Sequence, residues 1–112
     1  MDVSSLAAAA PFTTKDGSTI RELHHTREQS LAEASLPDGM RTERHYHARS
    51  EEIYFLLEGE GELELDGELR RVVAGDAALI PPGVRHQITA VGALRFLCCC
   101  APPYSDADTF FA

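Results

Sequence analysis

Residues 39–59 read GMRTERHYHARSEEIYFLLEG. His45 and His47 are separated by one residue, and the pair Glu51-Glu52 follows after a short polar gap. The chain is then apolar at every position of Ile53–Leu57. A strand that is apolar on both faces must be covered on both faces. The stretch therefore predicts a group of polar side chains, of residue types that can bind metals, next to a strand that packs on two sides.

Short β-prone runs alternate with turn signals along the chain, and no longer segment has helical periodicity. Asp66-Gly67 is a two-residue hairpin signal that sets the preceding ELEL opposite the following ELRR. Pro37-Asp38-Gly39 and Pro81-Pro82-Gly83 are further turns. We therefore expect an all-β domain of antiparallel strands. The expected strands are Thr19–His25, Leu31–Leu36, Arg44–Ala48, Glu52–Leu57, Gly61–Leu65, Glu68–Val73, Ala77–Ile80, His86–Ala90 and Leu94–Cys100.

Three histidines and a glutamate could share one metal ion. Side chains two apart on a strand point the same way, about 6.5–7 Å apart along it, so His45 and His47 can converge. His86 follows a turn made rigid by two prolines, which sets the position of its strand. Only one of Glu51 and Glu52 can face inward with the histidines, because successive residues face opposite sides. Alternation alone leaves open which glutamate that is.

The spacing of these residues resembles the two motifs of the cupin superfamily. The first motif runs from Gly39 to Gly59 as G-x5-H-x-H-x4-E-x6-G. The second runs from Gly75 to His86 as G-x5-P-x-G-x2-H, after fifteen intervening residues. That separation is similar to the compact end of the superfamily. The two motifs together span nearly half of the chain.

The resemblance implies a double-stranded β-helix, or jelly-roll, barrel that is often dimeric and holds a divalent metal near its mouth. The ligands that it implies are His45, His47, Glu52 and His86. Glu52 fits the six-residue gap before the motif glycine, so Glu51 is expected to face outward. One position departs from the pattern, because Ala90 stands where the second motif usually has an asparagine.

The ligand set and its neighbours indicate a class of chemistry without naming a reaction. Three imidazoles and one carboxylate suit manganese, iron, cobalt, nickel, copper or zinc and do not choose among them. Tyr54 shares a face with Glu52 and is a candidate catalytic residue that orients a substrate or moves a proton. A buried core tyrosine is the alternative reading. Ile88 and Ala90 share a face with His86, which makes the expected pocket mostly apolar.

Two functions from different classes remain open. In the first, the protein is a mononuclear metal enzyme acting on a small oxygenated metabolite, as an isomerase, lyase, decarboxylase or dioxygenase. In the second, it is a non-catalytic module that binds or senses a small molecule through its metal. The complete ligand set favours the enzyme.

Composition excludes several other classes of function. The net charge of −8 opposes binding to nucleic acid or to an anionic membrane. The chain starts without a basic n-region and has no apolar run of about eighteen residues, so we expect a cytoplasmic protein without a membrane segment. Its 112 residues suit one domain. We expect an N-terminal arm at 1–18, the barrel at 19–100 and a C-terminal tail at 101–112.

The remaining features have modest interpretations. The outward face of Ile53–Leu57 is apolar and favours a homodimer. Three adjacent cysteines fit neither spaced disulfides nor a CxxC motif, and we read them as small residues of a strand, with a reactive thiol near the site as the alternative. The three cysteines are Cys98, Cys99 and Cys100. We interpret His24 and His25 as structural or surface residues. We interpret Arg41, Arg44 and Arg49 as a solvated rim, with attraction of an anion as the alternative.

Overall fold

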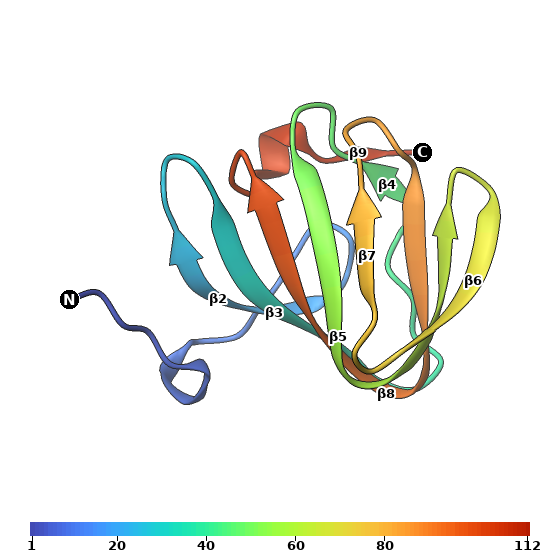
Figure 1. Cartoon of the computed structure of the whole chain (residues 1–112), viewed down its shortest axis with the longest axis horizontal. Coiled ribbons are helices and arrows are strands. Elements are labelled where there is room, and N and C mark those ends of the chain that lie inside the picture. The colour runs from blue at the N-terminus through green and yellow to red at the C-terminus, as the bar shows by residue number, and fades with distance from the viewer.

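A computed structural model describes residues 1–112 and consists almost wholly of antiparallel strands that curl into a barrel (Figure 1). The expected all-β jelly-roll class is confirmed. The strands are β1 (Phe12–Thr13), β2 (Thr19–His25), β3 (Ser30–Leu36), β4 (His45–Tyr46), β5 (Glu51–Leu65), β6 (Glu68–Val73), β7 (Ala77–Ile80), β8 (His86–Ala101) and β9 (Phe110–Phe111). The 3-10 turns η1 (Leu6–Ala8) and η2 (Asp106–Asp108) are the only helices, and neither could cross a bilayer.

Two long strands, β5 and β8, organise the barrel. They pair with each other in antiparallel register along nearly their whole length. The first half of β5 also pairs with β7, and its second half pairs with β6. The other edge of β8 pairs with β3 and, at His86, with β4. The sheet therefore closes around the face on which Glu52 and His86 lie.

Both long strands were expected as two strands each, and that expectation was wrong. The register of β5 against β8 shifts on either side of Glu58, so the strands bend together instead of ending. Gly59 has φ +84°, and a Cβ there would overlap the carbonyl oxygen of Ala93. A glycine is therefore required at this bend. From the sequence alone, a glycine at this position is equally consistent with the end of a strand.

Two short strands lie in segments that showed no strand pattern. β1 adds to the edge of β2, and β9 pairs with β4. The strand expected over Arg44–Ala48 is shorter, because the chain leaves the sheet after Tyr46. Strands β2, β6 and β7 have the expected bounds.

The barrel core lies between the two halves of the sheet. Its buried apolar residues are Ile20, Ala34, Leu36, Tyr54, Leu56, Leu63, Val72, Ile80, Ile88, Ala90, Leu94 and Phe96.

Candidate metal centre

Three histidines converge inside the barrel from two elements and a loop. His45 on β4 is paired directly with His86 on β8. His47 follows β4 by one residue and is not itself in the strand. One imidazole nitrogen of each of these residues lies within 4.8 Å of the others, and all three side chains are buried. The convergence expected of the H-x-H pair is therefore present, although only His45 is placed by a strand.

Backbone carbonyls fix the orientation of each imidazole. The Nδ1 atoms lie at 2.7 Å from the Glu43 oxygen for His45, at 2.9 Å from the Val84 oxygen for His86 and at 3.1 Å from the Asp108 oxygen for His47. A carbonyl can only accept, so each Nδ1 carries the proton and donates it. In the neutral ring the lone pair is then on Nε2. This is the arrangement that holds a metal-binding histidine in place.

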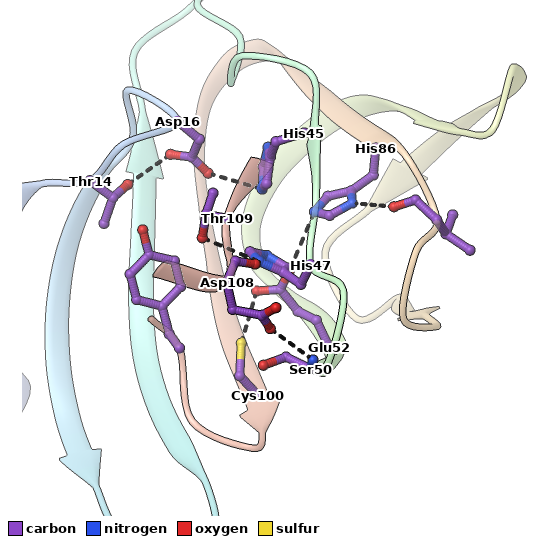
Figure 2. A network of polar contacts seen from close by, with 12 residues as sticks. Thr14, Asp16, His45, His47, Ser50, Glu52, His86, Cys100, Asp108 and Thr109 are labelled. Carbon is purple, nitrogen blue, oxygen red and sulfur yellow. Dashed lines mark hydrogen bonds and ion pairs between the residues drawn. The ribbon is translucent and has the colours of Figure 1, made fainter. Parts of the chain in front are cut away.

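Glu52 completes the cluster from β5. Its Oε1 lies 3.3 Å from Nε2 of His47 and 3.4 Å from Nε2 of His86 (Figure 2). The neighbouring Glu51 is exposed. Oε1 of Glu52 and Nε2 of His86 are fully buried, and neither has a hydrogen-bond partner. Unpaired buried polar atoms are rare and costly, and a bound cation between them would satisfy both. The donor set thus fits a divalent ion.

The charges of these groups suit a cation. Burial opposes ionisation of Glu52, but in the absence of a metal His47 and His86, when protonated at Nε2, outweigh it and lower the pKa of Glu52 to about 2. Burial and the neighbouring His86 lower the pKa of His45. Burial also acts against protonation of His47, yet Glu52 outweighs it and raises the pKa of His47. The cluster therefore contains one firmly anionic carboxylate and at least one imidazole that favours the neutral, metal-binding form.

Contacts outside the expected ligands hold Glu52 and His47 in place. The Cys100 thiol lies opposite Glu52 across β5 and β8, and it donates to Oε2 at 3.2 Å. That contact leaves Oε1 turned toward the histidines. On the other side, Thr109 Oγ1 lies 3.3 Å from His47 Nδ1. The C-terminal segment thus reaches the centre that the two sequence motifs define.

The Asp108 side chain supports the loop that follows His47. Its carboxylate accepts hydrogen bonds from the backbone N–H groups of Ala48, Arg49 and Ser50 at 3.0–3.2 Å. Figure 2 shows the one from Ser50. Burial opposes ionisation of Asp108, but these N–H donors outweigh it and lower its pKa. The loop between β4 and β5 is therefore held by a residue about sixty positions away in the chain.

A narrow pocket with a cavity volume of about 40 Å³, partly open to solvent, leads to the centre. Phe12, Ile20 and Phe96 are among its apolar walls, and His45, His47 and Glu52 lie in its lining. Tyr54 also lines it. The centroid of its ring lies 4.6 Å from that of Phe96 and 6.1 Å from that of His86. Burial and the charge of Glu52 raise the pKa of Tyr54 well above its usual value. The phenol therefore suits a hydrogen-bond donor better than a base.

A family model described as "Cupin domain" matches residues 32–100. The chain belongs to the cupin family. This cupin is 50% identical over 106 residues to an uncharacterised protein of Methanocaldococcus jannaschii, with 88% of this chain and 85% of the relative covered. It is 32% identical over 72 residues to an oxalate-binding protein of Thermotoga maritima, covering 64% and 60%.

Solved structures show the same fold at low identity. Pac13 of Streptomyces, described as a nucleoside dehydratase, superposes with a TM-score of 0.83 and 18% identity. The match covers 97% of this cupin and 88% of Pac13. At this identity the likeness concerns the fold of the barrel.

The remaining residues singled out in the sequence lie outside the centre. His25 contacts Glu22, at 3.1 Å, and Arg44 pairs with Glu64 at 2.6 Å. None of His24, His25 or the three arginines lines the pocket. Cys98 and Cys100 do line it, whereas Cys99 is exposed on the opposite face of β8.

The sequence did not single out several polar residues of the pocket, among them two acidic residues, a serine and a tyrosine. Asp16 and Ser18 lie in the β1–β2 turn, Tyr104 lies in the tail and Glu22 lies on β2. The first pair had a weak signal, because Lys15-Asp16-Gly17-Ser18 is a turn sequence. Nothing in the spacing of the other two marks them.

Proposed function

We propose that His45, His47, Glu52 and His86 together bind one divalent transition-metal ion. The observation that carries this proposal is the pair of buried atoms, Glu52 Oε1 and His86 Nε2, that face each other without a hydrogen-bond partner. The three backbone-anchored imidazoles supply the remaining ligand atoms. Such a nitrogen and oxygen set suits manganese, iron, cobalt, nickel, copper or zinc.

We further infer that this cupin is a metal-dependent enzyme acting on a small oxygenated metabolite. A bound ion would act as a Lewis acid toward an oxygen of the substrate. The pocket's apolar walls would hold the carbon skeleton, and Tyr54 would donate a hydrogen bond while excluding water from the inner wall. Isomerase, lyase, decarboxylase and dioxygenase reactions are compatible with this arrangement. The description of Pac13 as a dehydratase supports the lyase class for a barrel of this kind.

A non-catalytic binding module is the second candidate. The relative from T. maritima is named for binding oxalate, and a firmly protonated Tyr54 suits binding as well as catalysis. In this case the same centre would hold a ligand through the metal without converting it.

Titration of stripped protein with manganese, cobalt and zinc tests the metal proposal. We expect one ion per chain in the wild type and a loss of affinity of about 100-fold in His47→Gln, since a ligand is removed. His24→Gln, a change outside the cluster, is the matched control and should bind like the wild type. Equal affinities in the two variants would contradict the ligand assignment. Anomalous scattering at several absorption edges identifies the ion.

A metabolite screen then separates enzyme from binding module. The metal-loaded protein is incubated with small keto, hydroxy and phenolic compounds, and the reaction is followed by proton NMR. New product signals that disappear in His47→Gln indicate an enzyme. Line broadening of an unchanged compound, also lost in His47→Gln, indicates a binding module.

A further inference from the structure

Asp16 presents one free carboxylate oxygen beside the metal centre. Its Oδ1 accepts three hydrogen bonds within the β1–β2 turn, from Thr14 Oγ1 at 2.7 Å, Ser18 N at 2.9 Å and Ser18 Oγ at 2.7 Å. Its backbone carbonyl accepts from the N–H of Glu43 at 2.8 Å. The turn is thereby tied to the segment that precedes His45. Both sets of bonds hold the carboxylate in one orientation.

That orientation turns Oδ2 into the pocket. Oδ2 lies 3.7 Å from Nε2 of His45, which is too long for a hydrogen bond (Figure 2). The proton of the neutral His45 ring is on Nδ1, where it is donated to Glu43. No donor of the protein is therefore bonded to Oδ2, although Asp16 lines the pocket. The oxygen is available to a ligand bound at the centre.

The basic side chains of the pocket are the histidines proposed as metal ligands, so none is left to offset this charge. None of its lining residues is a lysine or an arginine, and Glu22 adds another acidic group. Lys15, next to Asp16 in sequence, points to the C-terminal segment, where it donates to the carbonyl of Thr109 at 2.9 Å. A divalent ion held by Glu52 would thus already be neutralised by Asp16. A carboxylate ligand would then meet a like charge, whereas a hydroxyl group could donate to Oδ2.

We propose that Asp16 makes this site select an uncharged, hydroxyl-bearing ligand, whose hydroxyl group donates to Oδ2 while a neighbouring oxygen binds the metal. The proposal rests on the proposed metal site, toward which the unpaired Glu52 Oε1 and His86 Nε2 point independently. The apolar walls formed by residues such as Ile20 and Phe96 suit an uncharged skeleton. Ligands such as oxalate, with two negative charges, are disfavoured in this chain.

Glycolamide and glycolate form a matched pair of probes for this selection. Both carry a hydroxyl group beside a carbonyl oxygen, and they differ mainly in charge. Because a carboxylate is the stronger metal ligand in itself, the informative quantity is how the ratio of the two affinities changes between variants. Both affinities are measured from the visible absorption of the cobalt-loaded protein.

Asp16→Asn is the decisive variant. Its amide oxygen can keep the Oδ1 contacts of the turn, while the charge and the accepting oxygen in the pocket are lost. We expect Asp16→Asn to bind glycolate about tenfold more tightly than the wild type does, and to bind glycolamide with unchanged or lower affinity. Glu28→Gln removes an equal charge from an exposed residue outside the pocket, and it should leave the ratio of affinities as in the wild type.

Several results would overturn the selection by Asp16. They are an equal ratio in the wild type and Asp16→Asn, an equal shift in Glu28→Gln, and a wild type whose spectrum responds to neither probe. If Asp16→Asn does not fold, Asp16→Ser is used as the test variant, because it keeps a hydroxyl oxygen in the turn. If neither variant folds, Asp16 has a role in the turn alone and the proposed selection is wrong. Cobalt stoichiometry is measured first. A wild type that binds no cobalt overturns the proposed function as well, whereas bound cobalt with an unmoved ratio overturns only the role of Asp16.

Discussion

The two faces of the first half of β5 differ sharply, although both are apolar in sequence. Tyr54 and Leu56 are 2% and 1% exposed and face the metal centre and core, while Ile53, Phe55 and Leu57 are 40%, 40% and 37% exposed. The inner face is complete within one chain. The outer face is a row of large apolar side chains that the chain itself does not cover, and Leu79 on β7 extends it beside Ile53. Hydrophobicity alone therefore does not tell a core face from a contact face.

The comparison predicts opposite outcomes for changes at adjacent positions. An inner side chain is fixed by the barrel, so its loss should affect folding or the metal. An outer side chain should affect association only. We propose that a second copy of this cupin covers the outer face, since exposed apolar rows of this kind mark contact surfaces.

The largest expected difference separates two adjacent leucines. Leu56→Ala removes a fully buried side chain and should lower the free energy of unfolding by about 2–5 kcal/mol. Leu57→Ala removes a side chain that is 37% exposed and should cost less than about 1 kcal/mol. Urea denaturation of both variants at equal protein concentration measures the difference. Equal losses would show that the outer face is as tightly packed as the core.

The adjacent glutamates give the next largest effect. Glu52→Gln removes the anionic ligand and should weaken zinc or manganese binding by about 100-fold, whereas Glu51→Gln should change it by less than about threefold. Both variants should fold, which a thermal melt of the stripped protein checks. Competition titration against a chelating dye measures the affinities. Similar losses in the two variants would mean that alternation does not assign the ligand.

Association is the property that the outer face should control. Phe55→Glu places a charge in the middle of the apolar row and should weaken a dimer by about tenfold or more, with metal content unchanged. Leu69→Glu changes an exposed apolar residue on β6 and serves as the control. Light scattering over a range of concentrations measures the mass. A wild type of monomer mass throughout, or a dimer unaffected by Phe55→Glu, would contradict the proposed contact.

Tyr54→Phe should have the smallest effect of the four. The change removes one oxygen and leaves the ring contacts with Phe96 and His86 in place. We expect metal affinity within about threefold of the wild type and an unchanged mass, with altered ligand binding or turnover. A loss of metal comparable to that of Glu52→Gln would give Tyr54 a structural role instead.

Alternation and motif spacing were sufficient for much of the fold and for the convergence of the four expected ligands. Strands β2, β6 and β7 were predicted with their observed bounds, and turn sequences follow both β6 and β7. The burial of Glu52 and the exposure of Glu51 follow from the same two-residue period. Binding of an ion by these residues stays a prediction.

The supporting residues could not be predicted, because long-range packing brings them to the centre. Asp16 reaches His45 from the β1–β2 turn, and Asp108 reaches the loop after His47 from the tail. Neither residue has a partner at a recognisable spacing in the sequence. The continuity of β5 through Gly59 was also hidden, since a glycine at a bend and a glycine at a strand end look alike.

The alternation of three adjacent cysteines across β8 provides a chemical reporter for the outer face. Burial raises the pKa of all three thiols, but Cys100 is buried and Cys98 is half-buried in the pocket, so a reagent in solution reaches these two less easily. Cys99 is exposed and lies beside Ile53, at the β8 edge of the apolar row. A maleimide should therefore modify Cys99 faster than the other two thiols. A second copy bound to the row would shield Cys99, so the labelling rate would fall as protein concentration rises. The rate of Cys99 labelling therefore measures association of the native chain without any substitution.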